Sequence, residues 1–578
     1  MGKKKNFCLH SEIYSPSDID RVLSMAVDET CLRGNNKKQK FFNVPCSFDI
    51  ETTSFYRDGD KCYDYEQYSR LGGKLEKCSC MYVWQFGING YVIVGRTWDE
   101  FTEMMAKVSE TLRLREDRRL IVFVHNLSYE FQFIRKRFTW NKVFSIDLRK
   151  PIYAITDSGI EFRCSYLLSG YSLGKLGDQL TKYKCAKMVG DLDYALMRHS
   201  GTPLTDKELG YCVNDVNVVM CYIQEMIERY RGITGLPITK TGFVRKYCRK
   251  QCLYTKDENG KTVNNWDFVN TIHSLNISGT DEFNVLQRAF SGGFTHANMN
   301  YTDDIVENVS SYDFTSSYPY VMVSEKFPMS SGVKVTVKSK KQFEFLISKY
   351  CCVFDIELTK LISTQAQDTP LSVSKCFYKE KVVENNGRVF AADKVVTTIT
   401  DVDYGVLKMF YKWDSERVVD MWCYKKEYLP TEFVRSILGL YANKTTLKGV
   451  VGKEVEYLNS KEMLNSCYGM CVTNPLRDEF TYEGEWDVAT LSPEKVFETL
   501  QKYNESRNRF LFYPWGVFVT AYARRNLFTG IYECGQDYVY SDTDSVKVRH
   551  ADRHQEYFKQ YNNLVQYKLR QACKHHGL

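Results

Sequence analysis

The chain has 578 residues, of which 43% are hydrophobic and 26% are charged, and its net charge is +7 at pH 7. This length predicts two or three domains with large cores, and no apolar run is long enough to span a bilayer, so no membrane partner is expected. The first residues lack the apolar segment of a signal peptide. The twenty cysteines are scattered, as is typical of reduced cytoplasmic thiols, which predicts a cytoplasmic protein.

The first half of the chain alternates predicted strands and helices. Strands are predicted over 42–51, 80–86, 91–94 and 120–124, and a helix over 98–118. Further helices are predicted within 125–134, from 171–176 and after Thr205, a plausible N-cap. This alternation predicts an α/β domain.

Acidic residues recur on these predicted elements. Asp49 and Glu51 alternate on one strand and therefore share a face, while Tyr211 and Asp215 are one helical turn apart. Each alone is more often a surface group than a ligand. Together with Glu130, they form the set that two-metal hydrolysis of a phosphodiester needs, in which one ion activates water and the other stabilises the leaving oxygen. Mg²⁺ suits such oxygen ligands.

Three segments, FDIETTS at 48–54, HNLSYEFQFI at 125–134 and YCVND at 211–215, resemble the three motifs of the 3′→5′ proofreading exonuclease of family B DNA polymerases. The resemblance implies an RNase H-like domain in which Asp49, Glu51 and Asp215 bind metal and Tyr211 orients the attacking water. It also implies that the frayed primer end is held by Asn126, Tyr129, Ser172 and Leu173.

Two positions depart from that pattern. Glu130 stands where the family has aspartate, and its extra methylene alters the expected metal spacing. Val189 stands where the family has a lysine before the pair Gly190-Asp191, and Lys187, two positions earlier, is a candidate substitute.

The second half begins with a polar segment, 256–265, that predicts a boundary loop. The pair Gly292-Gly293 follows, within Phe290–Thr295. Paired glycines are typical of a tight turn and equally of a backbone that approaches a ligand closely, and the sequence leaves both readings open.

A second group of acids lies further on. Asp542 and Asp544 alternate in a β-forming stretch and are expected to lie side by side on a hairpin-like edge, and Asp313 ends another predicted strand. A lone Asp-Thr-Asp is more often an exposed turn, but three carboxylates could hold two Mg²⁺ ions about 3.5–4 Å apart for phosphoryl transfer. The carbonyl of Phe314 would be a further ligand, and Tyr318 would lie under the incoming sugar and exclude a 2′-hydroxyl.

A predicted helix over 461–469 presents Lys461, Asn465 and Tyr468 on one stripe. Such a stripe is normally a solvated face. Opposite three carboxylates, it is better explained as a platform for the nucleotide, with Lys461 on the triphosphate and Tyr468 near the nascent base pair.

The segments DFTSSYP at 313–319, KEMLNSCYG at 461–469 and YSDTDS at 540–545 are similar to the three polymerase motifs of family B. Within that family, the early exonuclease motifs, the Gly-Gly-Phe ahead of 313 and TAYAR at 520–524 resemble the protein-primed polymerases of small tailed phages and linear plasmids. The resemblance implies that DNA contacts come from Gly292, Gly293, Phe294, Ser316, Gly469, Thr520, Arg524 and Thr543.

The implied organisation is an exonuclease domain over 1–245 and a polymerase domain over 246–578. The polymerase domain would hold a palm, fingers over about 430–475, and candidate terminal-protein insertions over about 400–455 and 474–509. Only 547–578, with a helix predicted over 555–573, follow the acidic pair, so the family's thumb is expected to be absent, truncated or separately encoded.

The predicted function is DNA-directed DNA synthesis with proofreading, in protein-primed replication of a linear viral or plasmid genome. The expected partners are template and primer DNA, deoxynucleotides, a terminal protein and two Mg²⁺ ions per site, which Mn²⁺ could replace, with the chain acting as a monomer. The alternatives are an RNA-primed family B polymerase and a thumb-less, non-catalytic fragment that binds nucleic acid.

Overall fold

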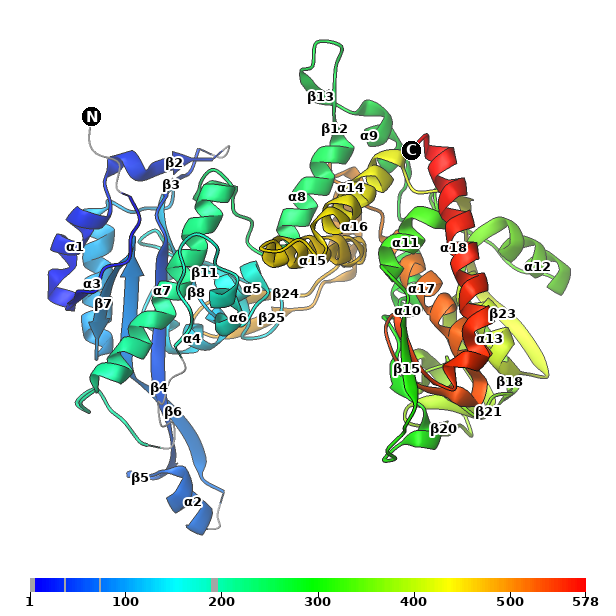
Figure 1. The fold of residues 1–578 in the computed structure, drawn as a ribbon, viewed down its shortest axis with the longest axis horizontal. Helices are drawn as coiled ribbons and strands as arrows, with labels where there is room; N and C mark the ends of the chain where they lie inside the picture. Colours follow the sequence, from blue (N-terminus) through cyan, green and yellow to red (C-terminus); the bar gives the residue numbers. More distant parts are fainter. Residues whose placement is uncertain (1–5, 36–37, 72–73, 189–195) are drawn as a thin grey trace. The chain divides into compact units, whose positions relative to one another are not determined.

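The computed structural model describes residues 6–35, 38–71, 74–188 and 196–578, which form two compact units (Figure 1). The first unit comprises Met1–Phe243 and Arg477–Leu491, and the second comprises Val244–Leu476 and Ser492–Leu578. All twenty cysteines lie in the described part of the chain, and each is a free thiol. None of the described helices combines the length and the apolar character needed to cross a bilayer.

The first unit is built on one mixed sheet. Its strands lie in the order β1 (Ile13–Tyr14), β7 (Tyr91–Gly95), β6 (Glu76–Ile88), β4 (Cys46–Asp58), β8 (Arg118–Val124), β11 (Ile160–Cys164), β10 (Pro151–Thr156), β9 (Trp140–Ser145), β24 (Glu479–Tyr482) and β25 (Trp486–Ala489), with β2 (Leu32–Gly34), β3 (Lys40–Phe42) and β5 (Lys61–Tyr63) beside this path. Central β4 pairs antiparallel with β6 and parallel with β8. Strand β4 begins and ends later in the sequence than the strand predicted over 42–51.

The helices of the first unit are α1 (Ile19–Ala26), α2 (Tyr65–Leu71), α3 (Trp98–Thr111), α4 (Leu127–Ile134), α5 (Ser165–Ser169), α6 (Leu173–Asp178) and α7 (Asp206–Arg229). The predicted N-cap is confirmed, since the Thr205 side chain accepts a hydrogen bond from the amide of Glu208. The helix predicted over 98–118 is too long. It ends at Thr111, because Arg113 adopts a positive φ of 51° and the chain then turns into the buried strand β8.

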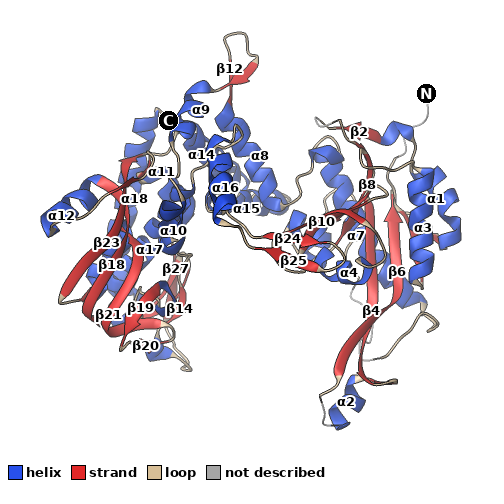
Figure 2. Ribbon diagram, turned by 180° about the vertical axis from the view of Figure 1, so that it is seen from behind, coloured by secondary structure: helices blue, strands red, loops and turns tan. Residues whose placement is uncertain are grey.

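A hairpin from late in the sequence completes the first unit (Figure 2). Strand β24 pairs with β9 through Phe480 and Ser145. The rings of Tyr482 and Trp486 pack against Phe131 of α4, with centroid distances of 5.4 and 5.7 Å. The segment 474–509, expected to be one insertion, is thus divided, because its next helix, α16 (Pro493–Glu505), belongs to the second unit.

The second unit contains three sheets. A four-stranded sheet has the order β14 (Thr295–Ala297), β26 (Tyr538–Asp542), β27 (Ser545–Arg549) and β15 (Val309–Asp313). A larger sheet has the order β16 (Phe327–Pro328), β23 (Ser415–Glu427), β18 (Tyr350–Ser363), β21 (Arg388–Thr400) and β19 (Cys376–Glu380), joined by β17 (Val333–Lys334), β20 (Val383–Asn385) and β22 (Tyr411–Lys412). The predicted boundary loop over 256–265 is instead a hairpin of β12 (Tyr254–Lys256) and β13 (Thr262–Asn264).

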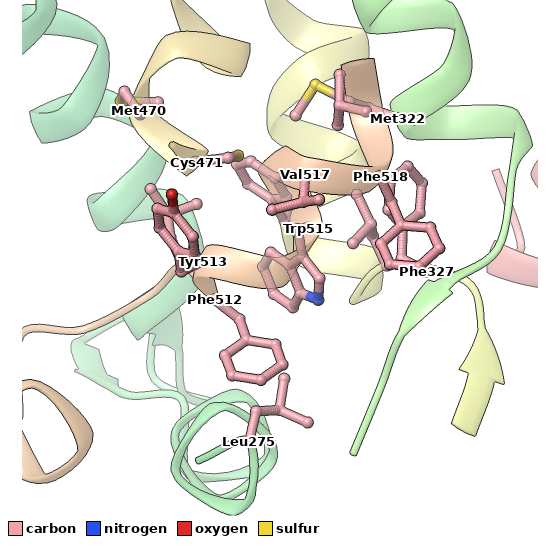
Figure 3. Packing of buried hydrophobic residues seen from close by; sticks show 14 of the residues in the cluster. Leu275, Met322, Phe327, Met470, Cys471, Phe512, Tyr513, Trp515, Val517 and Phe518 are labelled. Atoms are coloured by element: carbon pink, nitrogen blue, oxygen red, sulfur yellow. The ribbon is translucent and has the colours of Figure 1, made fainter. Parts of the chain in front are cut away.

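The helices associated with the second unit are α8 (Lys240–Leu253), α9 (Trp266–Ser274), α10 (Thr280–Ala289), α11 (Ser317–Ser324), α12 (Lys340–Lys349), α13 (Asp401–Phe410), α14 (Thr431–Leu447), α15 (Glu454–Cys471), α16, α17 (Tyr513–Cys534) and α18 (Gln555–His576). Helix α17 is buried on nearly every side. Its residues Trp515 and Phe518 are fully buried and pack with Phe327 and Met322 in the core of this unit (Figure 3). A helix that is apolar all round is typical of such a position.

The segment 400–455 does not form a body of its own. Its first part supplies α13 and β23, which pack on or pair within the larger sheet. Its last part supplies α14, which packs against α15 as a helix pair over 431–471, the range in which fingers were expected.

Two candidate active sites

The first candidate site lies where β4 meets α7. Asp49 and Glu51 point from the same face of β4, and Asp215 lies one turn after Tyr211 on α7. One carboxylate oxygen of Asp49, Glu51 and Asp215 can be chosen so that all three lie within 4.8 Å of one another. These predicted metal ligands therefore come together although Asp215 lies more than 160 residues after Glu51 in the sequence.

Burial and mutual repulsion shift the acids of this site strongly. Burial, with the charge of Asp215, raises the pKa of Asp49 to about 7. Burial and both neighbouring acids raise the pKa of Glu51 to about 9, and burial raises that of Asp215 to about 6. Acids crowded in this way are stabilised in their charged form by a cation. The oxygen donors present fit a hard divalent ion such as Mg²⁺.

Glu130 on α4 belongs to the same cluster. Its side chain is only 4% exposed, and burial, Asp49 and Glu51 raise its pKa well above the ordinary range. Its Oε2 is buried and accepts no hydrogen bond from a described residue. Glu130 is thus close enough to feel the charges of Asp49 and Glu51, and one of its oxygens is left without a hydrogen-bond partner among the described residues.

Lys187 occupies the position expected of the substitute lysine. Its Nζ lies 3.5 Å from Oδ2 of Asp215 and 5.4 Å from the ring centre of Tyr211. The Tyr211 side chain also hydrogen bonds to Asp215 and, like Lys187, opposes the rise in the pKa of that acid. The family position at Val189, with Gly190 and Asp191, falls outside the described residues.

The predicted primer-end residues lie at the starts of two helices of the first unit. Asn126 caps α4 with a left-handed backbone (φ 90°), and Ser172 precedes α6, where Leu173 begins the helix. Tyr129 is 41% exposed, and its hydroxyl lies 2.5 Å from Oγ1 of Thr52, next to Glu51. The exposed ring is therefore tied to the strand that carries the acids.

These shifts predict that stability of the first unit depends on pH and metal. Because Asp49, Glu51 and Asp215 have raised pKa values, the folded state holds protons that the unfolded chain releases. Their contribution is present below about pH 4 and is lost as pH rises through about 6 to 9. In EDTA, we expect the hydrogen-exchange protection factors of α7 to be lower at pH 9 than at pH 6, and Mg²⁺ or Mn²⁺ to restore them. Protection that is unchanged by pH in EDTA would contradict this crowding.

The second candidate site lies at the turn of the β26–β27 hairpin. Asp542 ends β26, and Thr543 (φ 53°) with Asp544 forms the turn before Ser545. The expected hairpin edge is present, but the two acids lie at its tight turn and not at alternating positions of an extended strand. The turn is joined to β15, where Asp313 pairs with Ser545 and the amide of Phe314 donates to the carbonyl of Asp544 at 2.7 Å.

The three acids of this site influence one another electrostatically. Burial, Asp313 and Asp542 raise the pKa of Asp544, whereas Lys461 opposes the shift. Asp542 is exposed and accepts a hydrogen bond from Oγ1 of Thr295 at 2.8 Å. Among the described residues, only the first site brings three ligand atoms within 4.8 Å, so the acids here are spaced more widely. Three carboxylates and the nearby Phe314 carbonyl still form a donor set of the kind that Mg²⁺ takes.

Two tyrosines and two lysines line the approach to these acids. The ring of Tyr318 on α11 stacks on that of Tyr468 on α15, with centroids 4.3 Å apart. Lys461 is exposed on α15, as is Asn465 one turn later. Lys444 on α14 was not predicted. Its Nζ donates to Oγ of Ser316 at 3.0 Å, and burial and Lys461 lower its pKa while Asp313 raises it.

The glycine loop, residues 290–295, passes so close to the β26–β27 hairpin that a side chain at Gly293 would not fit. A Cβ on Gly293 would meet Cγ2 of Thr543 at 2.7 Å and the hydroxyl of Tyr318 at 3.1 Å. The carbonyl of Phe294 accepts a hydrogen bond from the amide of Thr543 at 2.8 Å. Of the two readings of the paired glycines, close approach therefore applies, although the neighbour is the protein's own β26–β27 turn and not a ligand.

Two predicted DNA contacts require correction. Thr520 is fully buried, and its hydroxyl donates to carbonyls of its own helix α17. Phe294 is 3% exposed and packs under Arg388, whose guanidinium lies 4.5 Å from the ring centre. Both side chains are therefore buried, and neither is exposed at the surface as a DNA contact would require. Gly292 and Gly469 are exposed, and Ser316 is half-buried.

Arg524 contacts the glycine loop. It is 9% exposed, forms an ion pair with Asp403 at 2.8 Å, and donates to the carbonyls of Ser291 and Gly292. The arginine of the predicted template-binding pattern is thus tied to the loop.

Comparison with known proteins identifies relatives of the chain. A family described as DNA polymerase type B, organellar and viral, matches residues 179–563. The DNA polymerase of Bacillus phage phi29 is 24% identical over 515 residues, covering 82% of this chain and 77% of the phage protein. That of Bacillus phage B103 is 23% identical over 505 residues, covering 82% and 78%.

Solved structures show the same fold. The structure of phi29 DNA polymerase with primer-template DNA and incoming nucleotide has a TM-score of 0.58 at 16% identity, covering 88% of this chain and 80% of that chain. The binary complex with primer-template DNA has a TM-score of 0.60 at the same identity and coverage. The predicted mixed α/β multidomain fold is confirmed by this likeness. Because the family match extends over more than half of the sequence, the chain belongs to the organellar and viral DNA polymerases of type B.

Proposed function

We propose that the second unit extends a primer with deoxynucleotides directed by a DNA template, and that the first unit removes mismatched 3′ ends. The observation that carries the proposal is the meeting of Asp313 with Asp542 and Asp544 opposite the helix of Lys461. Extension of a labelled primer on a defined template with Mg²⁺ tests it. Incorporation dictated by the template is expected, and no incorporation under these conditions would contradict it.

In the polymerase site, Asp313, Asp542, Asp544 and the carbonyl of Phe314 would hold two Mg²⁺ ions. Bound there, the ions lower the pKa of the primer hydroxyl and neutralise the nucleotide's phosphates. The chain's own groups position the nucleotide. Lys461 and Lys444, from the two helices of the pair, bind the triphosphate, while the stacked rings of Tyr318 and Tyr468 support its sugar and base.

In the exonuclease site, Asp49, Glu51 and Asp215 would hold the ions, with Glu130 as a further acid. Bound ions supply an activated water and stabilise the leaving oxygen. Tyr211 orients the water, and Lys187 beside Asp215 offsets the negative charge that develops in the transition state. Asn126, Tyr129, Ser172 and Leu173 hold the primer end.

We further propose that synthesis starts from a hydroxyl of a terminal protein and that the chain works as a monomer in the cytoplasm of an infected cell. The polymerase motifs, TAYAR at 520–524 and the phage relatives support this proposal. Priming by RNA is the alternative.

Tyr318→Val is expected to admit ribonucleotides. The Tyr318 ring is stacked on Tyr468, so its loss leaves room where a 2′-hydroxyl would clash. We expect the ratio of kcat/KM for dCTP to that for CTP to fall by about 10- to 200-fold, the effect of reshaping an apolar pocket. Tyr318→Phe keeps the ring and should keep the discrimination. Unchanged discrimination in Tyr318→Val would remove the sugar-gate role.

A further inference from the structure

A cavity behind the glycine loop of the second unit carries positive charge that the proposed chemistry does not use. Its volume is about 320 Å³, and it is lined by residues 289–294 together with parts of β21, α13 and α17. Gly292 and Gly293 are exposed at this loop. Because Gly293 also touches the catalytic turn, the cavity lies beside the polymerase site.

Three basic side chains and one acid line this cavity. Lys375, Arg388 and Arg524 are the cations, and Asp403, paired with Arg524 at 2.8 Å, is the acid. Neither Lys375 nor Arg388 forms an ion pair within 4 Å with any residue that the structure describes. With one carboxylate for three cations, the lining has an excess of two positive charges.

The carbonyl groups of the loop face these cations. Nζ of Lys375 donates to the carbonyl of Phe290 at 2.5 Å, and Arg524 donates to the carbonyls of Ser291 and Gly292. Arg388 instead donates to the carbonyl of Pro370 at 3.3 Å. Carbonyls supply only partial negative charge, so they do not neutralise the lining.

Burial makes the uncompensated charge costly. Burial lowers the pKa of Lys375, and the charge of Arg524 lowers it further. Burial also lowers the pKa of Arg388. Asp368, which is outside the lining, attracts Arg388 but is itself paired with His296 at 2.9 Å. Buried cations are stabilised when an anion joins them.

The donors present select the class of anion. Arginine offers a planar fork of N–H donors and lysine a point charge, and together they are typical of phosphate recognition. The open glycine loop adds exposed backbone at the entrance.

We propose that this cavity is a phosphate-binding site and that its occupant is a phosphodiester of the single-stranded template beside the glycine loop. The inference rests on the proposed polymerase function and deepens it, because it adds Lys375 and Arg388 to the residues that hold the template. Free phosphate or pyrophosphate has the same chemistry, and the experiment separates the two sources.

The test is the salt dependence of DNA binding, measured by fluorescence anisotropy without Mg²⁺ or nucleotide. The substrate is a primer-template with a single-stranded template overhang. In Lys375→Met/Arg388→Gln, we expect affinity to fall by at least about tenfold. The slope of log affinity against log salt should become shallower by about 0.7, the value for one phosphate contact of a single strand.

Three further variants test whether a loss of affinity reflects only a disturbed glycine loop. Arg388→Gln alone spares the contacts that hold residues 290–292 and should still reduce the slope, whereas Arg388→Lys keeps the charge and should preserve it. Lys379→Met removes an exposed lysine on β19 and serves as the matched control, with no expected change.

An unchanged slope in the double variant overturns the proposal, whether affinity falls or not, since a fall alone would reflect a disturbed loop. Calorimetry with inorganic phosphate and pyrophosphate, without metal, provides the other arm. Binding of these ions by the unmodified chain but not by the double variant, with an unchanged DNA slope, would replace the template with a free anion. Failure of the unmodified chain to extend primers, with the slope change intact, would count against the proposed function alone.

Discussion

Asp544→Asn should lower the rate of primer extension by at least about a thousandfold. Asp544 is the half-buried acid of the second site, and its charge interacts with Asp313, Asp542 and Lys461. Asparagine keeps the size but removes the charge that holds a divalent ion, and such an ion supplies several kcal/mol of transition-state stabilisation. A loss of about 4 kcal/mol corresponds to about three powers of ten in rate. Single-turnover extension with saturating dNTP and Mg²⁺ measures it.

The matched control is Asp552→Asn, an exposed acid eight positions later that lies outside the site. It should extend primers at the unmodified rate. Both variants should retain 3′→5′ degradation of single-stranded DNA, because the first site draws its acids from other segments. Extension by Asp544→Asn within a few-fold of the unmodified chain would remove this residue from the catalytic centre.

Glu51→Gln should have the converse effect, lowering degradation of a single-stranded primer by about a thousandfold while leaving extension intact. A carboxylate oxygen of Glu51 lies within 4.8 Å of oxygens of Asp49 and Asp215, and burial together with these two charges raises the pKa of Glu51 to about 9. Losing its charge removes one of the few ligands of the metal pair, with a cost of several kcal/mol. The measurement is the rate of nucleotide release from a 3′-labelled strand in the absence of dNTPs.

Asp58→Asn, at the exposed end of the same strand, is the control and should degrade DNA normally. With a mismatched primer end and all four dNTPs, Glu51→Gln should extend the mismatch where the control first removes it. Equal release of nucleotides by the two variants would place the nuclease chemistry elsewhere.

Local patterns predicted the elements that carry the first site. Strand β8 followed from a continuous apolar run, and the start of α7 followed from Thr205 and Glu208, whose side-chain contacts depend only on nearby sequence. The alternation of Asp49 and Glu51 on β4 likewise needs no distant partner.

What sequence reasoning missed depends on contacts between distant segments. Lys444 carries no motif of its own, and it reaches Ser316 because α14 packs against α11 as well as α15. A prediction that the helix of Lys444 packs beside the helix of Lys461 would have placed Lys444 near the site. Thr520 has the residue type of a DNA contact but points into a core formed by many segments. The turn at Thr543 requires a positive φ, which threonine seldom adopts, so an extended strand was the better local guess.

The hairpin of β24 and β25 has a consequence for biosynthesis. The polypeptide passes from one unit to the other three times, after Phe243, Leu476 and Leu491. A ribosome that has finished the first 243 residues has therefore not yet supplied Tyr482 and Trp486, the rings that cover Phe131. The nascent first unit therefore keeps an apolar patch uncovered until this late segment is made, and a gene cut at the first crossing would encode a first unit that lacks this cover.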